Sequence, residues 1–192
     1  MEKKRNGQTI IIAILAVAIL FMSVGFAVYA TTLNINGDVE VDAAKWDIHW
    51  DSESYTPAAG SVKIYNSDMT QEKPDLTNTG VTFKAKLTKP EEYAEFSIDA
   101  VNAGTFDAKL KNIKISPVLT EAQKKYLTYT VTYNGNEYEA TTNNLSIPLN
   151  HGDSNRVTVS IKVKYEQPAD PTALPQNAET LEVNVDFDYE QV

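Results

Sequence analysis

Residues 90–110 read PEEYAEFSIDAVNAGTFDAKL, and this stretch indicates the fold class of the chain. Residues 96–101 place apolar side chains at every second position, which is the period of a strand with one buried face. Asn102-Ala103-Gly104 then supplies residues that tolerate turn dihedrals, and Phe106 to Leu110 begins another strand. A strand, a turn and a second strand are the building unit of an antiparallel sandwich.

The same two-residue period recurs later in the chain. Asn134-Gly135 separates two short runs and is the strongest hairpin signal in the sequence. Leu110 and the next apolar residue, Ile113, are three positions apart instead of two, and Ile115 then continues the two-residue period. One extra residue between Leu110 and Ile113 predicts a β-bulge. The other alternating segments are residues 81–87, 127–133, 157–165 and 181–189.

Two stretches depart from this period. Thr120 stands where a helix N-cap would lie and Gln123 follows three positions later, a capping box that predicts one short helix over residues 120–127. Residues 52–80 hold prolines, glycines and many polar residues, so we expect a long surface excursion with one short strand near 62–65. Loops of this kind often carry binding residues.

These segments predict about eight to ten strands and one short helix, which is typical of an all-β fold. The expected architecture is an antiparallel two-sheet β-sandwich, either jelly-roll or immunoglobulin-like, preceded by an N-terminal hydrophobic helix. The chain contains no cysteine. A hydrophobic core must therefore hold the domain together without disulfides.

The amino-terminal residues 1–30 form a separate segment. Residues 10–30 are an apolar run long enough to cross a bilayer, since about 20 helical residues span its hydrocarbon core. Basic residues at positions 3–5 precede the run and predict a cytoplasmic amino terminus. Val28-Tyr29-Ala30 offers a signal-peptidase site, so the segment is either a signal peptide or a retained transmembrane signal-anchor. Residues 31–192 are then an extracellular domain, secreted or held at the outer face of the cell membrane.

Residues 1–30 and residues 31–192 carry net charges of opposite sign. The formal net charge is -9, and residues 1–30 carry +2 of it, which leaves -11 on the remaining residues. An acidic exported domain is repelled by phosphate backbones and anionic lipid surfaces. We therefore expect no nucleic acid among its partners, and membrane contact only through Ile10 to Ala30.

Residues 46–51, WDIHWD, hold the chain's one metal-like pattern. Three apolar residues share one strand face and are expected in the core: Trp46, Ile48 and Trp50. Two carboxylates and an imidazole, which are ligand types for divalent metals, share the other face: Asp47, His49 and Asp51. A solvated strand face is the preferred interpretation, so these three stay weak metal candidates and we expect no cofactor.

Residues 31–41, TTLNINGDVEV, read as an extended arm or a strand with a glycine kink. Freed from a membrane segment, such an arm could add to the sheet edge of a neighbouring molecule. Self-association or pairing with other surface proteins is the expected interaction. The candidate interaction residues are the apolar positions Leu33, Ile35, Val39 and Val41.

The exported leader, the tryptophan-containing strand and the segments NAGTFDAKL and NHGDSNRVTVSIKV together resemble the TasA/camelysin class of Gram-positive matrix-fibre proteins. The resemblance covers residues 31–165 and implies a jelly-roll sandwich and assembly into fibres. The leader departs from the pattern, because AVYATTLNING stands where the family has an aromatic-rich segment beside the cleavage site. Camelysin-like members are described as metallopeptidases, but no residue pattern here matches a peptidase site.

Three functions compete at this point. The first is a non-enzymatic structural protein, a self-associating matrix or fibre subunit that uses strand pairing. The second is a membrane-tethered adhesin or ligand-binding module. The third, a hydrolase, needs an activated nucleophile or a positioned acid–base pair, and a chain with no cysteine and two histidines offers neither pattern.

Overall fold

The computed structural model describes residues 14–19, 43–152, 155–170, 172, 174–175 and 180–192, in two units, 1–42 and 43–192. Residues 14–19 are helical and carry exposed apolar side chains. No helix among the described residues is long and apolar enough to cross a membrane. The rest of the expected membrane segment lies outside the described residues, as do the candidate interaction residues Leu33, Ile35, Val39 and Val41.

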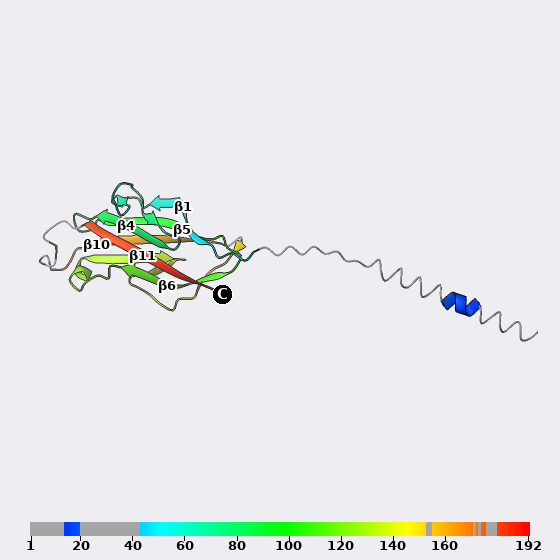
Figure 1. Ribbon diagram of the computed structural model, residues 1–192. Coiled ribbons are helices and arrows are strands. Elements are labelled where there is room, and N and C mark those ends of the chain that lie inside the picture. Colours follow the sequence, from blue (N-terminus) through cyan, green and yellow to red (C-terminus); the bar gives the residue numbers. More distant parts are fainter. Residues whose placement is uncertain (1–13, 20–42, 153–154, 171, 173, 176–179) are drawn as a thin grey trace, which may run out of the picture. The chain divides into compact units, whose positions relative to one another are not determined.

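Two antiparallel sheets make up the unit 43–192 (Figure 1). The first sheet has the order β1-β5-β10-β7-β8, formed by Ile48–Pro57, Tyr93–Asn102, Arg156–Tyr165, Leu127–Tyr133 and Asn136–Tyr138. The second has the order β2-β4-β11-β6-β9, formed by Ile64–Tyr65, Gly80–Lys86, Thr180–Gln191, Ala108–Ser116 and Ile147–Leu149. A further short strand, β3 (Asp75–Leu76), pairs with β4. The expected all-β, two-sheet antiparallel architecture is confirmed.

The chain changes sheet at most of its connections. Strands β4, β5, β6 and β7 follow one another in sequence and lie alternately in the second and the first sheet. The β7–β8 connection is instead a two-residue hairpin, with Asn134 at φ 49° and Gly135 at φ 76°. Positive φ at both turn residues is the geometry that Asn-Gly favours, so this sequence signal predicted the hairpin correctly.

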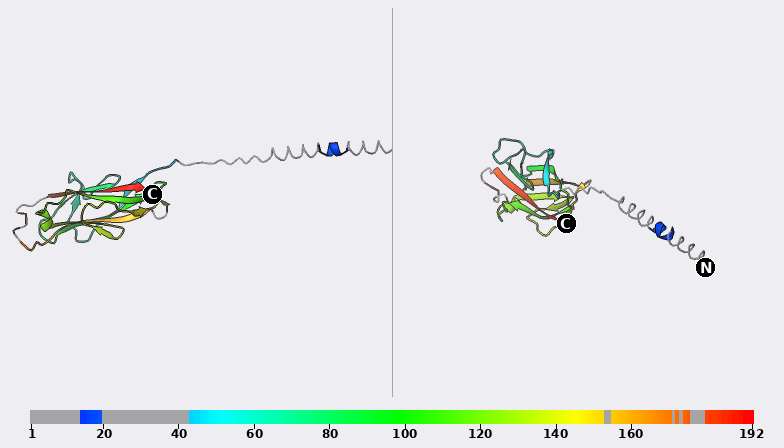
Figure 2. Two further views of the ribbon diagram at one scale, coloured as in Figure 1. Left: turned by 90° about the horizontal axis from the view of Figure 1, so that it is seen from below. Right: turned by 45° about the vertical axis from the view of Figure 1, so that its right-hand side comes forward.

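The core lies between the two sheets, which Figure 2 shows as facing layers. Trp50 of β1 packs edge-on against Phe187 of β11, with ring centroids 5.1 Å apart. Phe83 of β4 and Phe96 of β5 make a second edge-to-face pair across the layers, at 5.3 Å. Inward positions at every second residue supply the rest of the core, as the alternation predicts.

The turn after β5 fixes where β1 begins. The backbone N–H of Ala103 donates to the carbonyl of Asp47, and that of Thr105 donates to the carbonyl of Lys45. A Cβ atom at Gly104 would lie 2.6 Å from the Lys45 carbonyl oxygen, so only glycine fits this close approach.

Four expectations need correction. Trp46 is 48 % exposed rather than part of the core, because β1 begins at Ile48 and Trp46 lies beyond the end of the sheet. The capping box does form, but it caps a single 3-10 turn, Gln123–Lys125, and β7 begins at Leu127. Residues 52–80 are mostly loop and hold the expected short strand as β2, but β1 continues to Pro57 and β3 is a further short strand that was not expected. The described residues form eleven strands rather than eight to ten.

The expected bulge in β6 is confirmed. Tyr189 pairs with Leu110 and Asp188 pairs with Asn112, so Lys111 is the extra residue. This insertion moves the apolar phase from Leu110 to Ile113 and keeps both side chains buried.

Candidate functional site

One edge of the first sheet is open beside β7. Strand β8 pairs only with the end of β7, from Val131 to Tyr133. On the side away from β10, residues 127–130 have no strand partner in the described part of the chain. Exposed strand edges present free backbone donors and acceptors to other chains.

The hydrogen-bond pattern shows which backbone groups point outward at this edge. In a two-residue hairpin Tyr133 and Asn136 form the hydrogen-bonded pair, so the backbone of Tyr133 points toward β8. Every second residue of the strand shares this direction, which places the N–H and C=O groups of Leu127 and Tyr129 on the open side. On the other side, Tyr165 of β10 pairs with the backbone of Glu91 and Glu92 before β5, which agrees with this alternation.

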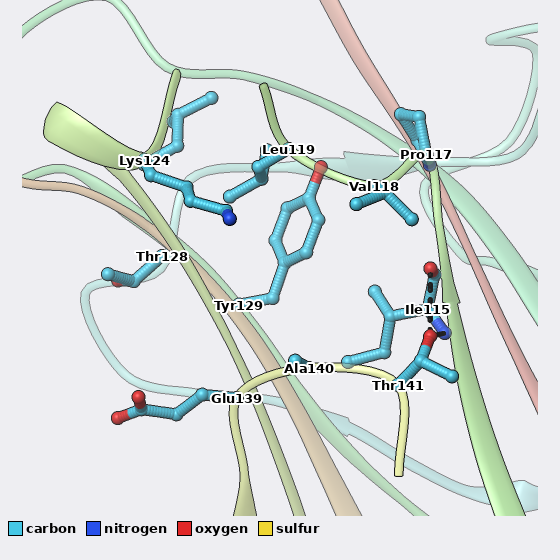
Figure 3. Close-up of a pocket in the computed structure, with 11 residues that line it drawn as sticks. Ile115, Pro117, Val118, Leu119, Lys124, Thr128, Tyr129, Glu139, Ala140 and Thr141 are labelled. Atoms are coloured by element: carbon cyan, nitrogen blue, oxygen red, sulfur yellow. Dashed lines mark hydrogen bonds between the residues drawn. The ribbon is translucent and has the colours of Figure 1, made fainter. Parts of the chain in front are cut away.

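A hollow of about 420 Å³ lies next to the open edge (Figure 3). It is bounded by the end of β6, the segment after it, the start of β7 and the loop after β8. Most of its lining is apolar, while Lys124, Thr128, Glu139 and Thr141 add polar groups. The apolar part consists of Ile115, Pro117, Val118, Leu119, Leu127, Tyr129 and Ala140.

Tyr129 is the unusual residue of this hollow. Its side chain stands among the lining residues, and in Figure 3 its hydroxyl lies between Leu119 and Val118. The residue is 5 % exposed, and its hydroxyl oxygen is buried with no hydrogen-bond partner among the described residues. Burial raises the pKa of the Tyr129 phenol to about 12, because ionisation in an apolar surrounding is unfavourable. The hydroxyl therefore stays protonated at neutral pH and is available as a donor.

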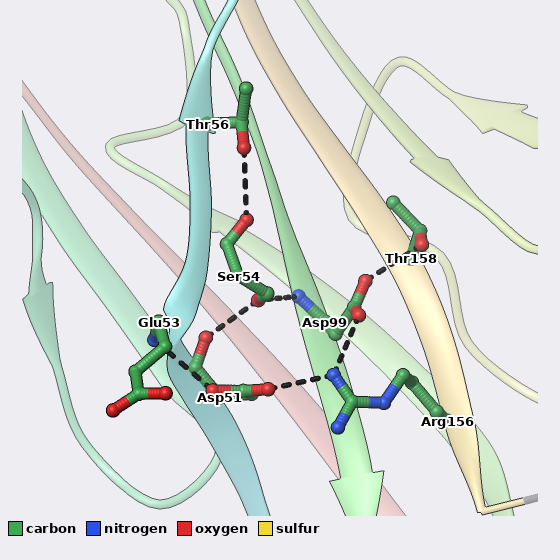
Figure 4. A network of polar contacts seen from close by, with 7 residues as sticks. All are labelled: Asp51, Glu53, Ser54, Thr56, Asp99, Arg156 and Thr158. Carbon is green, nitrogen blue, oxygen red and sulfur yellow. Dashed lines mark hydrogen bonds and ion pairs between the residues drawn. The ribbon is translucent and has the colours of Figure 1, made fainter.

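On the opposite side of the same sheet, a polar network ties β1 to the two strands beside it (Figure 4). One guanidinium nitrogen of Arg156 on β10 lies 2.7 Å from Asp51 of β1 and 2.9 Å from Asp99 of β5. The hydroxyl of Ser54 accepts the backbone N–H of Asp99 at 2.8 Å. These contacts join three strands. Separately, a register shift between Asp51 and Thr56 interrupts β1 and makes it a poorer template for pairing.

The three weak metal candidates do not act as one set. The Nδ1 atom of His49 lies 2.8 Å from Asp47, whose other carboxylate oxygen accepts a hydrogen bond from Lys45. The hydrogen bond from Lys45 has the larger effect in lowering the pKa of the Asp47 carboxyl, and the bond with His49 lowers it further. Asp51 points instead to Arg156, and this hydrogen bond lowers its pKa. In the described ranges, no group of three or more His, Cys, Asp or Glu residues is arranged to hold a metal ion.

A second, smaller hollow of about 350 Å³ lies within residues 52–80, the stretch in which the sequence suggested binding residues. Tyr55 contributes an aromatic ring that also packs against Phe96, with centroids 5.5 Å apart. Polar side chains from β1 and from the segment before β4 surround it. Its lining residues are Ser52, Tyr55, Gln71, Lys73, Pro74, Asp75 and Leu76.

Sequence reasoning missed both the open edge and the Tyr129 hollow. The alternation in residues 127–133 placed Tyr129 correctly on an inward face, but the period does not show that β8 is too short to cover it. Arg156, which directly precedes the expected strand 157–165, was likewise given no role. Its two carboxylate partners come from strands that precede it by 57 and 105 residues.

Comparison with known proteins adds no identification: no protein-family model matches the chain, and no curated protein shows significant similarity to it.

Proposed function

We propose that this protein is a non-enzymatic structural protein of the cell surface whose domains self-associate by strand pairing into a matrix or fibre. The observation that carries the proposal is the open edge of β7, where the backbone groups of Leu127 and Tyr129 have no strand beside them. An added strand would gain main-chain hydrogen bonds at that edge. The other edges are less suitable, because β1 carries a register shift and β2, β3 and β9 are two or three residues long.

The donor in this proposal is the arm Thr31 to Val41. Its alternating apolar residues would face the gap between the sheets while its backbone pairs with the edge. Addition of one molecule's arm to the next does not close on itself, so it produces filaments. The resemblance of residues 31–165 to the TasA/camelysin class of matrix-fibre proteins supports the same function.

Residues 1–30 act in this proposal as a signal peptide or a signal-anchor, and the domain lies outside the cell. Lys3, Lys4 and Arg5 before the apolar run support that orientation. Protease added to intact cells that lack an outer barrier should degrade the domain. Full protection of the domain in such cells would contradict the proposed location.

The sheet orders also support a finer topology. The order β1-β5-β10-β7 corresponds to strands A, B, E and D of an immunoglobulin-like sandwich, and the neighbours β6 and β11 correspond to C and F. Strand β4 occupies the place of strand G, although it precedes β5 in the chain. We therefore favour an immunoglobulin-like arrangement with this one departure over a jelly-roll.

Two chains test the function, one beginning at Thr31 and the other at Ala43. All described core residues lie within 43–192, so both chains contain the complete core. Sedimentation should show oligomers or fibres for the longer chain and monomers for the shorter one. In the longer chain Leu33→Asp should abolish assembly, whereas Asn34→Asp adds the same charge on the other face and should preserve it. Monomers from both chains at high concentration would overturn the proposal.

The second candidate is a membrane-tethered adhesin or ligand-binding module. The hollow beside Tyr55 favours it, because aromatic and polar side chains converge there within the long connection between β1 and β4. A monomeric chain from Thr31 that binds a surface ligand, and loses binding on Tyr55→Ala, would support this function over assembly.

A further inference from the structure

The hollow beside β7 contains a hydrogen-bond donor that the protein does not use. The Tyr129 hydroxyl is buried and unpaired among the described residues, while the surrounding side chains are mainly aliphatic. A phenylalanine would fill the same space without burying an unpaired polar group, which is unfavourable. The tyrosine hydroxyl therefore lacks a structural explanation within the domain.

The size and lining of the hollow suit a small ligand. Its volume of about 420 Å³ falls in the range of ligand pockets, which are mostly apolar with a few polar groups that fix orientation. Val118 is 77 % exposed, so one wall of the hollow faces solvent. In Figure 3 this side chain lies beside the Tyr129 hydroxyl.

We propose that this hollow is a binding site for a small apolar molecule, or an apolar group, that carries a carbonyl oxygen as a hydrogen-bond acceptor. The aliphatic side chains Ile115, Leu119 and Leu127 contact the apolar body of the ligand. The Tyr129 hydroxyl donates to the carbonyl oxygen. This site does not depend on strand addition at the neighbouring edge, and it binds its ligand in the monomer.

The chemistry of the site selects among ligands. The Tyr129 phenol stays neutral, so its hydroxyl carries a proton to donate, and an acceptor on the ligand would satisfy that proton. An uncharged carbonyl meets this need without the desolvation cost of burying a carboxylate. Lys124 does not supply a free charge for an acid, because its ammonium group already lies 2.6 Å from Glu121.

Acetophenone and ethylbenzene are matched probes for this site, since they share a ring and a two-carbon substituent and differ in the carbonyl oxygen. Titration of the chain from Ala43, followed by the methyl NMR signals of Ile115, Leu119 and Leu127, reports occupation of the hollow. Both probes should shift these signals. Acetophenone should bind Tyr129→Phe about five- to tenfold more weakly than the unmodified domain, which is the effect of one hydrogen bond.

Ethylbenzene should bind both forms equally, because it makes no hydrogen bond. Tyr93→Phe is the matched control, since the Tyr93 hydroxyl donates to the carbonyl of Ala59 away from the hollow. It should leave both affinities unchanged. The thermal midpoint of Tyr129→Phe should equal or exceed that of the unmodified domain, which separates lost binding from lost folding.

Two results would overturn the proposal. Absence of methyl shifts at millimolar probe would show that the hollow does not admit a ligand. Equal acetophenone affinity in the unmodified domain and in Tyr129→Phe would show that the hydroxyl does not donate to it. Neither result bears on fibre assembly, which is measured on the chain from Thr31.

Discussion

The side-chain amide of Asn102 donates a hydrogen bond of 2.9 Å to the backbone carbonyl of Leu149 and thereby joins β5 of one sheet to β9 of the other. The same amide nitrogen donates to the carbonyl of Phe106, and the amide oxygen accepts the N–H of Gly104. Asn102 is 2 % exposed, and its bond to Leu149 is buried while the other two are partly buried. One buried side chain thus fixes the turn after β5 and one end of the space between the sheets.

Replacing Asn102 by alanine should destabilise the domain by about 2–3 kcal/mol, because two backbone carbonyls and one N–H lose their buried partner. Urea denaturation measures this difference in the free energy of unfolding. Asn112→Ala is the control, since Asn112 is half-buried, its amide donates to the side chain of Asp188, and its amide oxygen accepts only a 3.3 Å bond from the N–H of the exposed Asn144. Similar losses in the two variants would contradict the role assigned to Asn102.

The strand phase of β10 gives a second prediction. Ile161 is buried between the sheets and Lys162 points outward toward Glu95. Ile161→Ala should reduce the free energy of unfolding by about 2–5 kcal/mol through lost burial and a cavity. Lys162→Ala should change it by no more than about 0.5 kcal/mol, as for an ordinary surface residue. Equal effects of the two substitutions would mean that the inward and outward faces of β10 are assigned wrongly.

The buried tyrosines predict loss of stability at alkaline pH. Burial raises the pKa values of Tyr129 and Tyr133 to about 12. Burial also raises the pKa of Tyr189 above its ordinary value. Between about pH 10 and 12 the unfolded chain releases these protons while the native domain keeps them. Stability is therefore unaffected below pH 10 and falls as the pH rises through this window. Absorbance at 295 nm should show that the signal of Tyr129 and Tyr133 titrates only near pH 12. A single transition near pH 10 for all tyrosines would contradict this.

The weak metal candidates lead to a fourth prediction. Asp47 and His49 pair with each other and Asp51 pairs with Arg156, so no preformed ligand set faces one point. Calorimetry with calcium and with zinc should detect no tight site on the domain. A sub-micromolar affinity that disappears in His49→Ala but survives in His151→Ala would reverse the present interpretation.

The sequence predicts those parts of the fold that depend on local period. Val81, Phe83 and Ala85 alternate with polar residues because one face of β4 is buried, and the structure buries all three. The Asn134-Gly135 turn and the extra residue at Lys111 are equally local signals. Trp46 shows the limit of this reasoning, because its position in the alternation cannot show that the sheet ends before it.

The candidate site depends on distances that a local pattern does not contain. The hollow forms because the end of β6 and the start of β7 belong to different sheets and β8 stops at Tyr138. Tyr129 reads as one more inward aromatic residue, and only the tertiary arrangement shows its hydroxyl unpaired. The Arg156 network is missed for the same reason, since outward residues on three strands meet only after the sheet has formed.

The position of β11 in the second sheet has a consequence for the order of folding. This strand pairs with β4 on one side and β6 on the other, and Val185 lies opposite both Val81 and Ile115. The centre of the sheet is therefore the last of the described strands in chain order, and its partners precede it by up to about a hundred residues. Pairings this distant in the chain make folding slow. Because β4 and β6 are joined to each other only through β11, the second sheet cannot form until this strand is in place.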